Sequence, residues 1–198
     1  MGIKKDISTN IALPKKKFSP NNYRKVSDAL EDLQDVSPVY DVVEDQNGIV
    51  LNFPSSVLSP LAMQLRDSAI LHNHIITRTR ETALERFGAL KQGENFHNLV
   101  DELKESTYTD VSRTQNTVYL RLKYSEPSGT VINVRKSMWI HPVINRAVSI
   151  REAARLQTFP DSFVFLGTKD SQYQQVGNAV PPIMAKAIAE KVIDLLES

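Results

Sequence analysis

The sequence contains no cysteine among its 198 residues. This absence excludes disulfide bonds, thiolate metal ligands and any reaction that begins with a thiol nucleophile. Its seven glycines never form a G-x-G pair, so the usual glycine-rich loop for a nucleotide-like cofactor is also missing. No run of 18 apolar residues occurs, and the first residues are polar and basic. We therefore expect a cytoplasmic protein without a membrane span.

The charges are close to balanced overall but unevenly distributed. The formal net charge is only +1, while residues 1–25 hold seven Lys and Arg residues against one acid, Asp6. Residues 31–45 are acidic, and basic residues return between Arg113 and Arg155. Local patches matter more for binding than the sum, so the net charge does not argue against a nucleic-acid partner.

The first two-thirds of the chain alternates short helical and strand patterns. Residues 1–25 are predicted to form an extended basic arm, and Ser27 to cap a first helix with Ala29, Leu30 and Leu33 buried. Asn47-Gly48 predicts a hairpin turn between residues 41–45 and 49–53. Further helices are expected from Ser59-Pro60 and over residues 80–91, and strands over 117–122 and 130–134. Ala83, Leu84, Phe87 and Leu90 are predicted to form the buried side of the helix over 80–91.

The last fifty residues combine two helices with a polar loop. Ser149 and Glu152 stand three apart, as in a capping box, and the helix that they open should end near Gln157, before Phe159-Pro160. A loop is predicted up to Val180. The final helix should start at Pro181-Pro182 and carry an apolar stripe made of Met184, Ile188, Val192 and Leu195.

Two stretches of this segment carry a family resemblance. REAARLQTFPD at residues 151–161 and YQQVGNAVPP at residues 173–182 strongly resemble the ninth and tenth ordered motifs of DNA (cytosine-5) methyltransferases. The sequence IHP at 140–142, followed by Arg146, and VSDALEDL at 26–33 also suit this family. Both long motifs stand in the expected order and at the expected spacing.

The resemblance covers nearly the whole chain, but only the back part of the family's enzyme. In the family, the earlier part holds a glycine-rich loop for S-adenosylmethionine, a Pro-Cys nucleophile, a Glu that assists at cytosine N3 and an Arg pair. None of these has a match here. Glu94-Asn95 and Arg78-Thr79-Arg80 look superficially similar to two of these elements, but both lie too far along the chain. We interpret them as a helix-to-loop junction and a surface helix start.

The resemblance assigns a cofactor segment and a DNA-binding segment. The turn before the final helix would close one wall of the S-adenosylmethionine site through Gly177, Asn178, Ala179 and Val180. Target recognition would lie between about residues 107 and 141, with Thr130-Val131 similar to a short Thr-Leu-like element near the flipped cytosine. The candidate DNA contacts are Arg113, Gln115, Arg121, Lys123, Thr130, Val131, Arg135, Lys136, Arg151 and Arg155.

Several of these residues have an equally plain structural interpretation. Arg151 and Arg155 lie four apart on one helical face and suit either phosphate contact or an intramolecular anchor. Thr130-Val131 is also what a strand favours. Trp139 and Gln157 are predicted as interior residues, and the four histidines show no ligand spacing, so no metal site is predicted.

The expected fold is α+β. Residues 26–148 would form a small mixed target-recognition domain with strands and short helices, and residues 149–198 the ninth and tenth motif segment. The C-terminal helix is expected to dock on a separate Rossmann-like α/β catalytic domain.

The chain would then be the DNA-recognition part of a restriction-modification methyltransferase, acting on duplex DNA with S-adenosylmethionine and inactive without a catalytic half that carries the cysteine. It would be the smaller subunit of a split enzyme or a piece of a longer one. The alternative is a stand-alone DNA-binding module without catalytic activity.

Overall fold

Short helices dominate the architecture, and a single two-stranded sheet accompanies them in the part of the chain that the structure describes. The structure is a computed structural model that describes residues 14–54, 57–105 and 113–196. The elements, in chain order, are η1 (Pro20–Asn22), α1 (Val26–Leu30), η2 (Glu31–Leu33), β1 (Ile49–Val50), α2 (Pro60–Leu65), β2 (Ile70–Leu71), α3 (Glu81–Ala89), η3 (Phe96–Asn98), α4 (Asp101–Lys104), α5 (Val134–Ser137), α6 (Ile150–Leu156), α7 (Lys169–Asn178) and α8 (Pro182–Leu196). The predicted mixture of helix and strand is confirmed.

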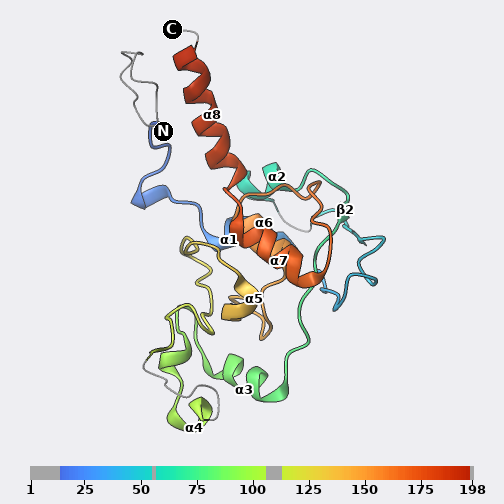
Figure 1. Ribbon diagram of the computed structural model, residues 1–198, viewed down its shortest axis with the longest axis vertical. Helices are drawn as coiled ribbons and strands as arrows, with labels where there is room; N and C mark the ends of the chain where they lie inside the picture. Colours follow the sequence, from blue (N-terminus) through green and yellow to red (C-terminus); the bar gives the residue numbers. More distant parts are fainter. Residues whose placement is uncertain (1–13, 55–56, 106–112, 197–198) are drawn as a thin grey trace.

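The main core forms where α1, α2, α6 and α7 meet. It contains Leu30, Leu61, Trp139, Ala153 and Tyr173, all buried. These helices gather around α6 in the upper body of the molecule (Figure 1). The interior position predicted for Trp139 is therefore confirmed.

A second, smaller cluster lies under α3, at the lower end of the molecule (Figure 1). Phe87 and Phe96 both pack against Tyr119, with ring centroids 5.6 and 5.8 Å apart. Of the predicted buried side of α3, Ala83, Phe87 and Leu90 are buried, whereas Leu84 is 41% exposed. The prediction for Leu84 was wrong: Ala83 and Phe87, four residues apart on α3, face the cluster, and Leu84 lies outside it.

Several predicted helix ends are confirmed by their hydrogen bonds. The Ser59 side chain accepts from Ala62 N at the start of α2. Ser149 and Glu152 form the predicted capping box of α6, which ends at Leu156. The first helix begins one residue before Ser27, because Lys25 is the N-cap and donates its backbone N–H to Asp28. Ala29, Leu30 and Leu33 are buried as predicted.

The predicted strands were wrong. A turn forms at Gly48, with φ +64° and a hydrogen bond from Gly48 N to Asp45 O. The predicted hairpin does not form, because β1 pairs antiparallel with β2, in the register Ile49 opposite Leu71, and not with residues 41–45. The backbone N–H groups of residues 119, 121 and 122 donate to the carbonyls of residues 137, 94 and 140, so they do not form one continuous strand ladder. Tyr119 has φ +53°, which an extended strand does not allow.

The second predicted strand, over 130–134, is replaced by the start of α5. Asn133 caps this helix with its side chain, and Met138 ends it at φ 52°. A capping side chain offers the backbone an alternative to a strand ladder. Among the described residues, Ile140 forms isolated β-bridges with Arg121 and with Ala147, and no strand results.

The C-terminal segment also departs from the prediction. Residues 169–178, expected as loop, form α7, with Thr168 as N-cap accepting from Ser171 N. The final helix α8 starts at Pro182 as predicted and projects from the rest of the molecule (Figure 1). Among the described residues, no helix is long and apolar enough to cross a membrane.

Candidate nucleic-acid interface

Helix α6 is fixed in the main core by two buried arginines. Arg155 is fully buried; its Nε and Nη2 donate to Asp161 at 2.9 and 2.6 Å, and its Nη1 also reaches Asp32. Burial opposes the charge of Arg155, but these carboxylates outweigh it and raise its pKa. Arg151, also fully buried, donates to the carbonyls of His72, Pro160 and Phe163 and to Asn73 Oδ1. Burial lowers the pKa of Arg151 to about 10.

The prediction that Arg151 and Arg155 contact DNA was therefore wrong. Neither side chain reaches the surface, and every polar arm is used within the chain. The alternative interpretation, an intramolecular anchor, describes both. They bind α6 to α1 and to residues 160–163.

A third predicted DNA contact, Arg121, is also interior. It is 4% exposed, and its Nη1 and Nη2 donate to the carbonyls of His141 and Phe87 and to Asn145 Oδ1. Burial lowers its pKa. Val131 is likewise buried in the main core. Both assignments are corrected, because a side chain enclosed in this way cannot touch DNA.

The remaining candidates are exposed. Arg113, Gln115, Lys123, Thr130, Arg135 and Lys136 all lie on the surface of the described chain. Lys123 pairs with Glu126 at 2.8 Å. Arg135 and Lys136 sit on α5, and Arg135 forms an ion pair with Asp170 of α7.

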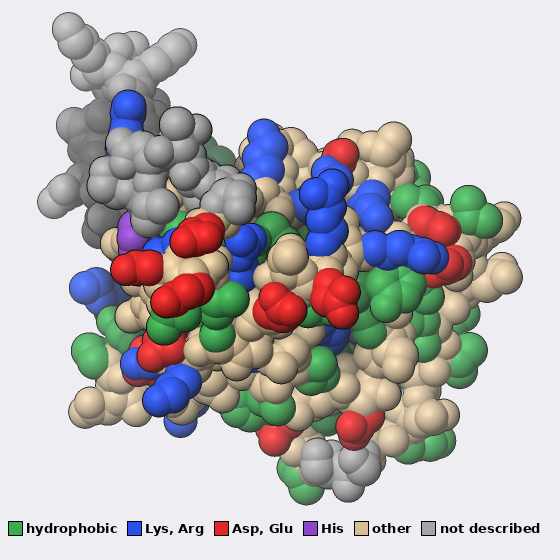
Figure 2. Space-filling model, turned by 90° about the horizontal axis from the view of Figure 1, so that it is seen from below, with side chains coloured by type: hydrophobic (Ala, Val, Ile, Leu, Met, Phe, Trp, Pro, Cys, Tyr) green, Lys and Arg blue, Asp and Glu red, His purple; other side chains and the backbone are tan. Residues whose placement is uncertain are grey.

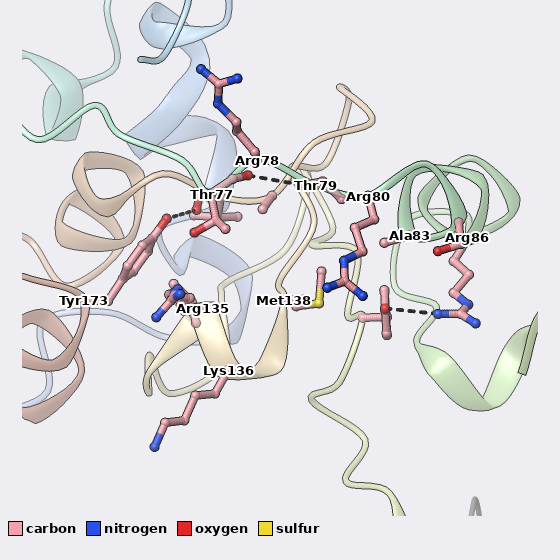
Figure 3. Close-up of a pocket in the computed structure, with 15 residues that line it drawn as sticks. Thr77, Arg78, Thr79, Arg80, Ala83, Arg86, Arg135, Lys136, Met138 and Tyr173 are labelled. Carbon is pink, nitrogen blue, oxygen red and sulfur yellow. Dashed lines mark hydrogen bonds between the residues drawn. The ribbon is translucent and has the colours of Figure 1, made fainter. Parts of the chain in front are cut away.

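A hollow of about 630 Å³ opens beside α5 and joins it to the segment that leads into α3. None of its lining residues is acidic. Five of them are cationic: Arg78, Arg80, Arg86, Arg135 and Lys136. We call this hollow the cationic groove. Figure 3 shows Arg80 reaching toward Met138, Arg135 lying beside Tyr173, and Arg86 at the far end.

The floor of the groove is rigid and partly apolar. Tyr119 and Met138 line it, and both have left-handed backbones, with φ 53° and 52°. Such conformations persist only where the surroundings impose them and are common at functional sites. Tyr173 is anchored under the groove by hydrogen bonds from its hydroxyl to the carbonyls of Ile75 and Val148.

The cationic side chains of the groove differ in how many contacts they already make within the chain. Arg86 donates to the Leu103 carbonyl and lies over the Tyr119 ring, and Arg78 lies over the Tyr40 ring. Within the described ranges, Arg80 and Lys136 form no ion pair and both are exposed. In Figure 2, Lys and Arg side chains gather on one part of the lower face, with Asp and Glu beside them. Arg80 and Lys136 therefore give the groove two unpaired positive charges, which attract phosphates.

Sequence reasoning missed three of these five residues. Arg78 and Arg80 were interpreted as a surface helix start, and Arg86 was not singled out. Arg80 does cap α3, but it has an extended backbone, with ψ 153°, and leaves its guanidinium free. A pair of arginines beside three threonines within 77–82 was the available signal.

Of the predicted cofactor residues, Gly177 and Asn178 form the end of α7, and Ala179 and Val180 follow it in the short link to α8. Asn178 and Val180 are exposed, Val180 by 58%, whereas Gly177 and Ala179 are half-buried. The absence of a side chain at Gly177 has a steric role. A Cβ on Gly177 would lie 2.8 Å from Asn133 N and Ile132 C. Gln157, predicted as a buried scaffold residue, donates to the Val176 carbonyl and holds this end of α7.

No metal centre is evident in the described part of the chain. Nowhere in it do three or more His, Asp or Glu side chains gather closely enough to hold an ion. The buried His74 and His141 instead bond to Ser149 and to the backbone of 143–144.

Comparison with known proteins gives the class. The family model for C-5 cytosine-specific DNA methylases matches residues 1–194. The chain belongs to this family. Members of the family use S-adenosylmethionine.

Individual relatives are type II methyltransferases by name. M.DdeI of Desulfomicrobium norvegicum is 31% identical, over 97% of this chain and 48% of its own length. M1.HphI of Haemophilus parahaemolyticus is 37% identical, over 65% of this chain and 33% of its own length. The chain thus spans half or less of the length of these relatives. M.AquIB of Picosynechococcus sp. differs: the match, at 36% identity, covers 64% of this chain but 90% of that protein.

A solved structure is also similar. It is a crystal structure of a protein assigned as a DNA modification methyltransferase encoded within an E. coli prophage. The TM-score is 0.56 at 27% identity, and the match covers 87% of this chain and 47% of the other.

Proposed function

We propose that this chain is the DNA-recognition part of a DNA (cytosine-5) methyltransferase and completes the cofactor pocket of a catalytic half located elsewhere. The observation that carries the proposal is the cationic groove: five Lys and Arg side chains on a rigid floor with no acid among its lining residues. Phosphates are the ligands that such a surface takes, and phosphate contacts fix the register of a protein on duplex DNA.

The need for a separate catalytic half follows from chemistry. Methylation of cytosine in this family begins with the addition of a thiolate to the ring, and this chain has no cysteine. The match to M.AquIB spans 137 residues and covers 90% of that protein. This supports the proposal that a DNA-recognition part can exist as a short chain of its own. The methyltransferase names of the relatives favour this role over a stand-alone DNA-binding module.

The end of α7 offers one wall for S-adenosylmethionine. The exposed Asn178 provides an amide and Val180 an apolar side chain, whereas Gly177 is already occupied by its contact with residues 132–133. Asn178 and Val180 fit a shared pocket that a second domain encloses. When bound there, the cofactor supplies the methyl group, and these residues hold and orient it.

Helix α8 is the proposed docking element for the catalytic half. Its first turn is tied to the core by a hydrogen bond from Ile183 N to Thr158 Oγ1. Further along, Met184 and Val192, both on the predicted apolar stripe, are 55% and 36% exposed. An unpaired apolar side of this kind marks a protein contact.

Binding of duplex DNA as a function of salt tests the proposal. The wild-type chain should bind a mixed-sequence duplex, and the logarithm of its affinity should fall linearly with the logarithm of the salt concentration. Arg80→Ala and Lys136→Ala should each reduce that slope by about one, the loss expected for one phosphate contact. The control is Lys186→Ala on α8, where an exposed lysine pairs with Glu190.

The outcomes separate clearly. An unchanged slope in both groove variants would overturn the assignment of the groove. A change in sequence preference, in place of uniform weakening, would make these side chains base readers. Absence of any DNA binding by the full chain, even at low salt, would contradict DNA recognition by this part.

A further inference from the structure

Three side-chain amides form a continuous chain between α5 and the end of α7. Asn133 Oδ1 accepts from Lys136 N at 3.4 Å and so caps α5. Asn133 Nδ2 donates to Gln174 Oε1 at 3.0 Å, and Gln174 Nε2 donates to Asn178 Oδ1 at 2.7 Å. We call these three residues the amide relay.

The two ends of the relay lie in different functional regions. At one end, α5 carries Arg135 and Lys136, which line the cationic groove. At the other end, Asn178 is an exposed residue of the proposed cofactor wall. Because Asn178 Oδ1 is held by Gln174, its amide N–H groups face away from the relay and are left for a ligand.

Backbone packing makes the junction stiff. Helix α5 packs on α7, and the two lie side by side in Figure 1. Gly177 sits against the backbone of Ile132 and Asn133, with no room for even a methyl group. Close-packed elements have low compressibility. The contact therefore holds α5 and the last turn of α7 at one separation, which keeps Asn133 within hydrogen-bond distance of Gln174.

We infer that the amide relay couples DNA binding in the groove to the position and order of Asn178, with Gln174 as the positioning residue between the two sites. The inference rests on the proposed function, since the groove must bind DNA for the relay to carry a signal. Such coupling is reciprocal: DNA that orders Asn178 favours cofactor binding, and cofactor held by Asn178 favours DNA binding by the same factor.

Hydrogen exchange on the full 198-residue chain tests this without catalysis. Amide exchange is followed with and without a mixed-sequence DNA duplex at low salt. In the wild type, DNA should slow exchange in residues 133–137 and also in residues 174–180, the latter by about twofold, the size of one amide–amide bond on a helix.

Neighbouring glutamines provide a matched pair of variants. Gln174→Met removes both relay bonds. Gln175→Met makes the same substitution one residue on, where the amide donates to the Leu166 carbonyl and Ser171 Oγ and takes no part in the relay. Gln174→Met should keep the slowing at 133–137 but lose it at 174–180, and Gln175→Met should keep both.

Each result decides something. Full slowing at 174–180 in Gln174→Met, or slowing in the wild type confined to 133–137, would overturn the relay while leaving the proposed function intact. No DNA-dependent change anywhere in the wild type would overturn the proposed function and the relay together.

Discussion

Gly177 and Asn133 lie so close that a methyl group on Gly177 would come within 2.8 Å of the Asn133 nitrogen. The atoms that a methyl group would meet belong to the backbone of Ile132 and Asn133, so no side-chain rotation can relieve the contact. It explains why a glycine stands in the last turn of α7, where the backbone φ would allow any other residue.

The first prediction follows from this contact. Gly177→Ala should lower the free energy of unfolding by about 1–3 kcal/mol, the cost of overpacking. Within a helix the same replacement normally stabilises by about 1 kcal/mol, so the sign is diagnostic. Urea unfolding is the measurement. The control is Gly129→Ala, where a Cβ meets nothing within 4 Å. A stabilised Gly177→Ala protein would contradict the contact.

The second prediction concerns the buried arginine of α6. Arg155→Met should destabilise the fold by about 3–5 kcal/mol, because it removes the bidentate partner of the buried Asp161 and leaves Asp32 with Arg66 alone. Arg135→Met removes a partly exposed ion pair with Asp170 and should cost less than about 1 kcal/mol. Equal unfolding midpoints for the two variants would mean that Arg155 is not the anchor described here.

The third prediction concerns pH. Burial lowers the pKa of His141 to about 4, more than the nearby Glu152 carboxylate raises it. The unfolded histidine, near 6.5, therefore binds its proton first as the pH falls. Its contribution to stability is complete above about pH 6.5 and is lost between about pH 6.5 and 4.

The variant His141→Asn isolates this effect. Asparagine keeps an acceptor for the N–H groups of Val143 and Ile144, which now bond to His141 Nδ1. Between pH 7 and 5 the wild type should lose roughly 2 kcal/mol more than His141→Asn. The buried His74, whose pKa is also lowered by burial, contributes a slope of the same sign to both proteins, so the difference between them reports His141. Identical slopes would exclude His141 as the titrating group.

A second pH window belongs to Glu152. Burial opposes its ionisation, but the hydrogen bonds from Arg146 outweigh burial and lower its pKa to about 2. Its contribution is present above about pH 4.5 and is lost as the pH falls toward 2. The acid transition should thus continue below the histidine window.

The fourth prediction concerns α8. Met184 lies on the predicted apolar stripe and is 55% exposed, so Met184→Asp should change the free energy of unfolding by less than about 0.5 kcal/mol. It should, however, prevent association through this helix, whether with a catalytic half or with a second copy. Sedimentation of the wild type and the variant over a range of concentrations is the measurement. Unchanged association would place the docking surface elsewhere.

Local signals in the sequence predicted the helix ends well and the strands poorly. Ser59 and Ser149 cap helices through hydrogen bonds within three residues, so their pattern is complete in the sequence. The strand over 117–122 failed because Tyr119 adopts a left-handed backbone imposed by its contacts with Phe87 and Phe96. Those contacts join residues far apart in the chain.

The candidate site divides in the same way. Arg135 and Lys136 were predicted from local charge and do line the groove. Arg121, Arg151 and Arg155 look identical to them in sequence, yet each is enclosed by carbonyls or carboxylates from distant segments. Arg80 was missed because its groove exists only after α3 and α5 are brought together.

Methyl transfer by the purified chain is the most direct test of the central claim. The chain alone, with duplex DNA and S-adenosylmethionine, should transfer no methyl group and form no covalent adduct with 5-fluorocytosine DNA. Addition of a catalytic half that carries the cysteine should restore transfer, and Arg80→Ala or Lys136→Ala should weaken it at elevated salt. Methyl transfer or adduct formation by the pure chain would contradict the account.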